Sequence, residues 1–91
     1  MTKAEMIDRL AAETGVTKID TRMMLNAFLK VIADELANGG SVKFSELGSF
    51  SIRIVSEHDH FNALTGETIH SPEQKRVKFK ASKGLKDRIN A

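Results

Sequence analysis

The side chains best placed to do chemistry are cations near the C-terminal end of the chain. Arg76, Lys78 and Lys80 occupy every second position. In an extended strand, alternate side chains leave the same face about 6.6–7 Å apart. Successive phosphates on one nucleic-acid strand are separated by a similar distance, roughly 6–7 Å. The pattern therefore predicts a strand that presents a row of cations to a phosphate backbone.

Charge is unevenly distributed along the chain, although the formal net charge is only +2. Residues 74–88 contain seven Lys or Arg and one Asp, whereas residues 46–73 contain one Arg and five acidic residues. Such a concentration of positive charge indicates an anionic partner, and the alternative is a merely solvated strand face and helix end. No helix carries the set of groups that pair with base edges, so we expect contacts to phosphates.

Composition argues against several other classes of protein. The chain has 91 residues and no cysteine, which predicts one domain without disulfides or thiolate metal sites. We find no nucleophile with its base, no phosphate-cradling glycine loop and no closed metal site, so we expect no enzyme, no cofactor and no small-molecule substrate. No membrane span or signal peptide is recognisable, which predicts a cytoplasmic protein without a membrane partner.

The N-terminal part is expected to form two helices. Thr2 and Glu5 form a capping box, Gly15 suits a helix end, and Thr17 can cap a second, longer helix. The second helix is apolar on more than one face, although the chain has only five Phe and no Trp or Tyr to build a core. A helix of this kind must be covered on several faces. We therefore expect a dimer, the alternative being a central core helix.

After Gly40 the hydrophobic period changes from that of a helix to that of a strand. Apolar and polar residues alternate at 42–44, at 49–54 and at 74–81, and Ser82 is placed to cap a short final helix. In the last of these strands Val77 and Phe79 point inward, so the three cations between and beside them point outward together.

Residues 56–71 lack a continuous apolar face. They contain a turn in which Gly66 is expected to supply a positive φ. The pattern alone therefore gives the order helix, helix, strand, strand, strand, helix, which is an α+β fold.

The whole chain resembles the HU and integration host factor family of bacterial histone-like DNA-binding proteins. The resemblance runs from Met1 to about Asn90 and rests on short motifs in the same order: Gly15, Asn26-Ala27-Phe28, Gly48-Ser49-Phe50, Asn62 with Thr65-Gly66-Glu67, Pro72, Phe79-Lys80 and Leu85-Lys86. It implies one domain over 1–91, with a helical dimerisation part (1–40), a three-stranded antiparallel sheet (41–81) with a long β-arm at about 54–75, and a C-terminal helix (82–91).

The resemblance also implies a function. Members form an intertwined dimer, here of the chain with itself or with a paralogous subunit, whose arms enter the minor groove of double-stranded DNA. They bend or compact the nucleoid DNA with low sequence specificity, unstacking bases to gain wrapped surface. The residues expected to bind DNA are Arg53, Asn62, Ala63, Leu64, Lys75, Arg76, Lys78, Lys80, Ser82, Lys83 and Lys86. Amides near Ser82 are expected to add a phosphate contact.

The chain departs from the family pattern in its arm and in two turns. Ala63 stands where the family has an intercalating proline, so Phe61 or Leu64 either replaces it as the wedge or packs at the tip. The ascending strand reads Val55-Ser56-Glu57-His58-Asp59-His60, and its two carboxylates are expected to weaken wrapping. Ala81-Ser82 replaces the usual Pro-Gly, which capping by Ser82 makes harmless. Glu46 replaces a common turn glycine.

Three histidines fall in the expected arm, namely His58, His60 and His70. Because imidazoles gain a proton near pH 6.5, one hypothesis is that the arm engages DNA more strongly as the pH falls. Alternatives are a metal site made from His58, Asp59, His60 and His70, or exposed histidines without a task. For the whole chain, the competing function is a dimeric scaffold or protein-interaction module with weakened DNA bending.

Overall fold

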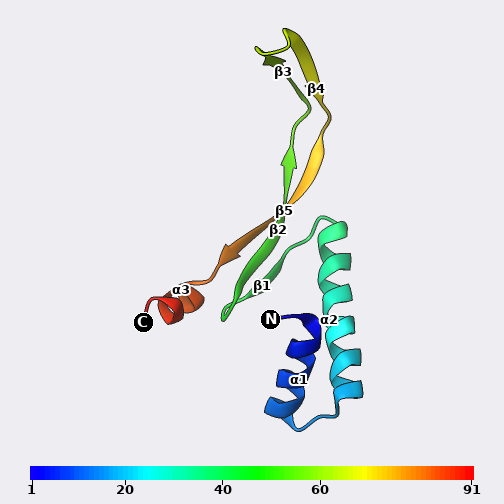
Figure 1. Ribbon diagram of the computed structural model, residues 1–91, viewed down its shortest axis with the longest axis vertical. Coiled ribbons are helices and arrows are strands. Elements are labelled where there is room, and N and C mark those ends of the chain that lie inside the picture. The colour runs from blue at the N-terminus through cyan, green and yellow to red at the C-terminus, as the bar shows by residue number, and fades with distance from the viewer. The chain divides into compact units, whose positions relative to one another are not determined.

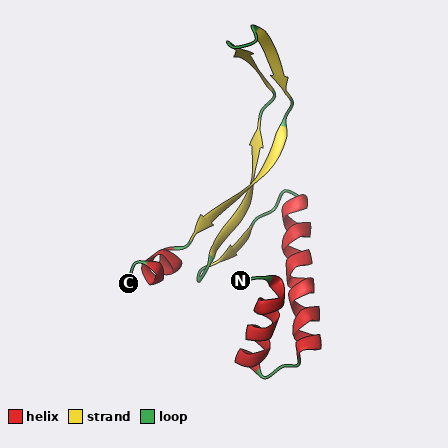
Figure 2. Ribbon diagram, viewed as in Figure 1, coloured by secondary structure: helices red, strands yellow, loops and turns green.

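The computed structural model describes residues 1–91, and its helices and strands are drawn in Figures 1 and 2. The elements in chain order are α1 (Lys3–Thr14), α2 (Lys18–Ala37), β1 (Val42–Phe44), β2 (Gly48–Val55), β3 (His58–Asn62), β4 (Glu67–Ser71), β5 (Gln74–Ala81) and α3 (Lys83–Ile89). The α+β class is therefore confirmed. The chain divides into two compact units, Met1–Asp34 and Glu35–Ala91.

The helix ends follow from local capping chemistry. The Thr2 hydroxyl accepts a hydrogen bond from the Glu5 amide at 3.3 Å, and Gly15 ends α1 with a φ of 72°. The Thr17 hydroxyl accepts from the Asp20 amide at 3.2 Å at the start of α2. These bonds satisfy amides that have no partner within their own helix. All three predicted caps are confirmed.

Few side chains are buried within one chain. Ile7 and Leu36 are the buried apolar residues, and Thr21 is the buried polar one. The Thr21 hydroxyl donates to the Thr17 carbonyl at 2.8 Å, so its burial leaves no unpaired group. By contrast, Met23 and Met24 on α2 are 66% and 73% exposed. A single chain therefore leaves much of the apolar surface of α2 uncovered.

The body of the second unit is a three-stranded antiparallel sheet in the order β1-β2-β5. Phe50 lies opposite Phe79, and Ser49 lies opposite Lys80. Gly48 begins β2 with a φ of 152°, and a Cβ there would collide with the carbonyl oxygen of Lys80. Glycine at this position lets β2 and β5 pair closely.

A separate two-stranded ladder, β3-β4, connects the ends of β2 and β5 (Figure 1). We call residues 58–71 the arm. The hydrophobic pattern indicated only three strands, because the arm has no apolar face; backbone hydrogen bonds hold its strands together without one. The arm implied by the family resemblance was expected at about 54–75, but residues 54–55 and 74–75 belong to the β2-β5 ladder. Gly66 has the predicted positive φ, 71°.

No helix of the chain combines the length and the apolar character that crossing a membrane requires.

Candidate nucleic-acid interface

The three cations of β5 share one face of the sheet. Arg76, Lys78 and Lys80 lie opposite Arg53, Ser51 and Ser49, respectively, in the β2-β5 ladder. The residues between them lie on the other face, where the rings of Phe50 and Phe79 are 4.8 Å apart between centroids. Because facing partners in a ladder point to the same side, the predicted row of outward cations is present. Arg53 extends it by one charge.

These cations are exposed and have no acidic partner. The four ion pairs of the structure involve Lys18, Lys30 and, twice, His70. None of the row Arg53, Arg76, Lys78 and Lys80 takes part in one, and all four residues are exposed. Their positive charge is therefore not cancelled within the chain.

A groove of about 530 Å³ lies where the sheet meets α3. Four lysines line it, Lys43, Lys80, Lys83 and Lys86, together with one acidic residue, Asp87. Lys80 belongs to both the row and the groove, so the two positive surfaces are continuous. An anionic partner that followed the row would meet the groove at its end.

Sequence reasoning missed Lys43 as a candidate. It lies between Val42 and Phe44 in β1 and pairs with Ser49, which pairs in turn with Lys80. The alternation of Val42 and Phe44 already indicated that Lys43 points to the polar face. Its place beside Lys80 depends on the register of three strands, which the local pattern does not give.

Ser82 caps the last helix, which explains why a serine stands at this position. Its hydroxyl accepts from the Leu85 amide at 3.1 Å and caps α3, as predicted. The Ser82 amide itself donates to the Leu47 carbonyl at 3.0 Å. Two of the amides near Ser82 are thus bonded within the chain, and the phosphate contact of this region stays a prediction that rests on the other amides and on the side chains of Lys83 and Lys86.

Lys75 does not join the row. It lies opposite Ile54, and its parity along β5 places it on the face of Val77 and Phe79. Lys75 was named among the residues expected to bind DNA and not as part of the row, and that role stays a prediction. In the sheet its ammonium group leaves from the other side.

Hydrogen bonds to Asn62 hold the turn at the tip of the arm, and two apolar side chains are exposed on either side of Asn62. The Asn62 side-chain oxygen accepts from the Leu64 amide at 3.0 Å, and its carbonyl accepts from the Gly66 amide at 2.8 Å. These bonds fix the turn that carries Ala63. Leu64 is 97% exposed and Phe61 is 67% exposed. An apolar side chain so exposed on a turn is a suitable wedge for insertion between bases.

The histidines of the arm lie on two different faces. His58 and His60 share one face, with ring centroids 5.7 Å apart, while Asp59 and His70 pair across the other. His70 contacts two carboxylates, Asp59 at 2.7 Å and Glu57 at 3.0 Å. The metal site considered from the sequence needs ligands from both faces at once, and no cluster in the chain has the arrangement of a metal site.

Glu46 lies in the turn between β1 and β2, where the family commonly has a glycine. Its φ is negative, as it is for every non-glycine residue of the chain, so this position does not require a glycine. The Ser45 hydroxyl donates to the Glu46 carboxylate at 2.7 Å. This bond, with a second from the backbone amide of Glu46, lowers the pKa of the carboxyl below its ordinary value. Glu46 is thus an anion held by its own turn.

Comparison with known proteins agrees with this geometry. The family model described as bacterial DNA-binding protein matches residues 1–90. The DNA-binding protein HU of Thermotoga maritima is 38% identical over 98% of this chain and 99% of its own length. The integration host factor subunit alpha of Methylococcus capsulatus is 37% identical over the whole of this chain and 83% of its own.

Solved structures give the same answer. The fold superposes on HU from a cocrystal of Anabaena HU with DNA, with a TM-score of 0.85 and 28% identity, over 98% of this chain and 97% of that one. It also superposes on HU from Thermotoga maritima, with a TM-score of 0.69 and 29% identity over 98% of each chain. The chain belongs to the family of bacterial DNA-binding proteins that contains HU and integration host factor.

Proposed function

We propose that the protein is an architectural, histone-like DNA-binding protein that bends or compacts double-stranded DNA with low sequence specificity. The observation that carries this proposal is the row Arg53, Arg76, Lys78 and Lys80 on one sheet face, exposed and without acidic partners. A row of that spacing matches a phosphate backbone and carries no information about base sequence.

The arm completes the surface. Beyond the row, β2 and β5 lead into a hairpin whose tip presents Leu64 almost fully to solvent. We assign the arm to the minor groove and the tip to a base step, with Leu64 as the apolar wedge and Ala63 beside it. In this assignment the row and the lysine groove bind the flanking phosphates. Sequence preference then arises only from how easily the DNA deforms.

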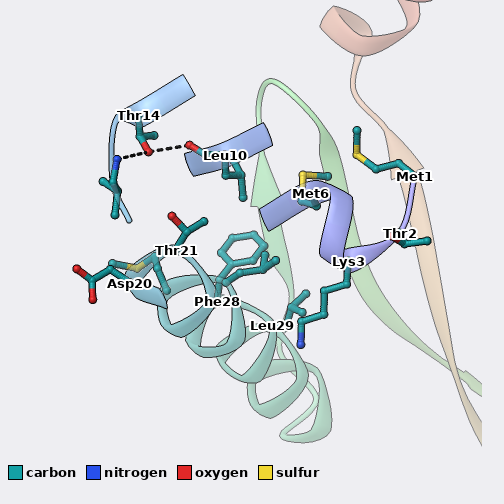
Figure 3. A pocket seen from close by; sticks show the side chains of 13 residues that line it. Met1, Thr2, Lys3, Met6, Leu10, Thr14, Asp20, Thr21, Phe28 and Leu29 are labelled. Atoms are coloured by element: carbon teal, nitrogen blue, oxygen red, sulfur yellow. Dashed lines mark hydrogen bonds between the residues drawn. The ribbon is translucent and has the colours of Figure 1, made fainter. Parts of the chain in front are cut away.

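The protein is proposed to work as a dimer, with itself or with a paralogous subunit. Within the helical unit an apolar groove of about 780 Å³ opens between α1 and α2, and Figure 3 shows Met6, Leu10 and Phe28 around it. With so little of the chain buried, a 91-residue monomer has a small core. A second copy would cover the helical groove and the exposed apolar sheet face at Val77 and Phe79.

The family is one of DNA-binding proteins rather than of enzymes. We propose accordingly that the protein acts by binding alone, in the nucleoid of the bacterial cytoplasm, with no cofactor and no small-molecule substrate. Its work on DNA is then mechanical, because binding energy is exchanged for bending and unstacking.

The experiment that tests the proposal is the salt dependence of duplex binding, combined with measurement of the bend angle. If the row neutralises phosphates, the logarithm of the binding constant falls steeply with the logarithm of salt concentration, by about 0.9 for each phosphate neutralised. Unrelated duplexes of equal length should then bind alike. Binding that is insensitive to salt, or a straight bound duplex, would contradict the proposal.

The second candidate is a dimeric scaffold of the same fold. The observation that favours it is the pair of carboxylates, Glu57 and Asp59, at the foot of the arm, where they would face phosphate. The same titration separates the two, since a scaffold forms its dimer at any salt concentration without binding duplex DNA.

A further inference from the structure

His70, at the foot of the arm, has a carboxylate close to each of its ring nitrogens. Its Nδ1 lies 2.7 Å from Oδ1 of Asp59, which is its ladder partner in β3. Its Nε2 lies 3.0 Å from Oε1 of Glu57, just before β3 begins. All three side chains are more than half exposed to solvent. We call Glu57, Asp59 and His70 the carboxylate clamp.

The protonation state of the clamp follows from hydrogen-bond chemistry. An ionised carboxylate only accepts, and a neutral imidazole has a single N–H, so it donates to only one of two carboxylates. The imidazolium has an N–H on each nitrogen, so it turns no lone pair toward either carboxylate. Of the two contacts, the one with Asp59 is a hydrogen bond, and the one with Glu57 is an ion pair when His70 is protonated. Loss of its proton leaves a ring lone pair facing an anionic oxygen, which opens one side of the clamp.

We propose that His70 is a positioning residue for DNA binding by the arm. As the imidazolium it holds the side chains of Glu57 and Asp59 and cancels one of their two negative charges. An arm whose ascending strand is acidic thereby becomes able to approach phosphates. This inference rests on the proposed function, because it concerns how the arm reaches DNA.

The surroundings of His70 leave the clamp as the only charged contact on its face. The other side chains of that face of the ladder are Phe61 and Thr68, which are uncharged. The opposite face carries the remaining titratable residues of the arm, His58, His60 and Glu67. A proton gained by His70 therefore lies in contact with Glu57 and Asp59. A proton gained by His58 lies on the opposite face of the ladder and contacts neither carboxylate through that face.

The size of the effect follows from the charge. One unit charge at contact distance from another in water changes an association constant about fivefold. Acidification, here from about pH 7.5 to about pH 5.5, favours the imidazolium over the neutral imidazole. We expect the affinity of the wild-type protein for a duplex, at fixed salt concentration, to rise about fivefold for each engaged arm over this interval.

Four variants test the assignment. His70→Gln removes the imidazolium and should lose the rise on acidification, remaining at the weaker affinity. His70→Lys supplies a permanent charge and should bind tightly at both pH values. His58→Gln is the matched control, since it removes a histidine of the same strand ladder but leaves the clamp intact, and it should keep the rise. Glu57→Gln with Asp59→Asn should bind tightly at both pH values.

A second readout needs no DNA. In the free protein, backbone amides of residues 58–71, followed by nuclear magnetic resonance relaxation, should become more ordered on acidification in the wild type and in His58→Gln. They should not do so in His70→Gln. A residue that merely stabilised the hairpin at all times would give no such pH profile.

The outcomes separate the inference from the function on which it rests. If His70→Gln keeps the wild-type pH profile, or if His70→Lys is no tighter than wild type at the higher pH, the positioning role is wrong while DNA binding stands. If no variant binds duplex DNA in a salt-dependent manner at either pH, the proposed function fails and this inference fails with it.

Discussion

Phe50 and Phe79 face one another across the β2-β5 ladder, with ring centroids 4.8 Å apart and ring planes inclined by 49°. This pair fixes which side of the sheet is apolar. Because side chains alternate along a strand, it also fixes the side from which Lys78 and Lys80 leave. The aromatic contact and the cation row are thus two consequences of a single register.

Lys80→Gln should weaken binding to every duplex alike, because Lys80 lies on the row of exposed cations and also lines the lysine groove. We expect the slope of the salt dependence to fall in magnitude by about one for each subunit. Fluorescence anisotropy over a range of salt concentrations measures both quantities. Lys30→Gln is the control, since Lys30 is 76% exposed but pairs with Asp34 on α2 and lies off the row. An equal loss in the two variants would remove Lys80 from the interface.

Ala63→Pro should increase the bend angle more than the affinity. The Ala63 amide makes no hydrogen bond in the turn, and Asn62 before it lies in a strand, which suits a residue that precedes proline. A rigid ring beside Leu64 would keep a base step open at a smaller entropic cost. Fluorescence energy transfer across a labelled duplex measures the angle. An unchanged angle would mean that this tip does not enter the base stack.

Leu64→Ser should reduce bending without destabilising the protein. Its side chain is 97% exposed, so its removal leaves no cavity, and the free energy of unfolding should change by less than about 0.5 kcal/mol. Thermal unfolding and the same bend assay provide the two measurements. Normal bending by Leu64→Ser and reduced bending by Phe61→Ser would transfer the wedge role to Phe61.

Met24→Glu should dissociate the dimer. Met24 is 73% exposed in one chain and lines the apolar groove between α1 and α2, so a carboxylate there is harmless in a monomer. Covered by a second chain, the same carboxylate is desolvated without a partner, which costs several kcal/mol. Sedimentation equilibrium should show monomers, with a lower melting temperature. Lys30→Gln should remain a dimer; a dimeric Met24→Glu would place the interface elsewhere.

Ser45→Ala should raise the pKa of Glu46. The Ser45 hydroxyl, helped by the Glu46 amide, holds that pKa below its ordinary value. A carboxyl with a lowered folded-state pKa stabilises the fold at pH values above its unfolded pKa, and that contribution disappears as the pH falls through the folded pKa. The variant should therefore lose less stability on acidification. Carbon-detected titration of Glu46 that is identical in both proteins would contradict this account.

The sequence predicted the features that depend on near neighbours. Thr2, Gly15, Thr17 and Ser82 act within a few residues of themselves, so their capping roles could be recognised from residue type and spacing. The outward direction of the cation row followed from strand periodicity. Val77 and Phe79 alternate with the cations in the same strand, so the apolar face and the charged face could both be assigned from local sequence.

The features that were missed depend on register between strands. Lys43 reaches the row only through the pairing of β1 with β2 and of β2 with β5. The contact of His70 with Asp59 spans eleven positions, and the turn at Asn62–Gly66 sets it. In a hairpin without an apolar face, hydrophobic periodicity does not predict which residues pair across the two strands.

The arm has no buried residue in either of its strands. The side chains of the arm therefore contribute little to the free energy of unfolding of the rest of the molecule. A substitution in the arm is expected to act mainly on the contact with a binding partner. A substitution in the arm is therefore expected to leave the stability of the sheet and the helices almost unchanged.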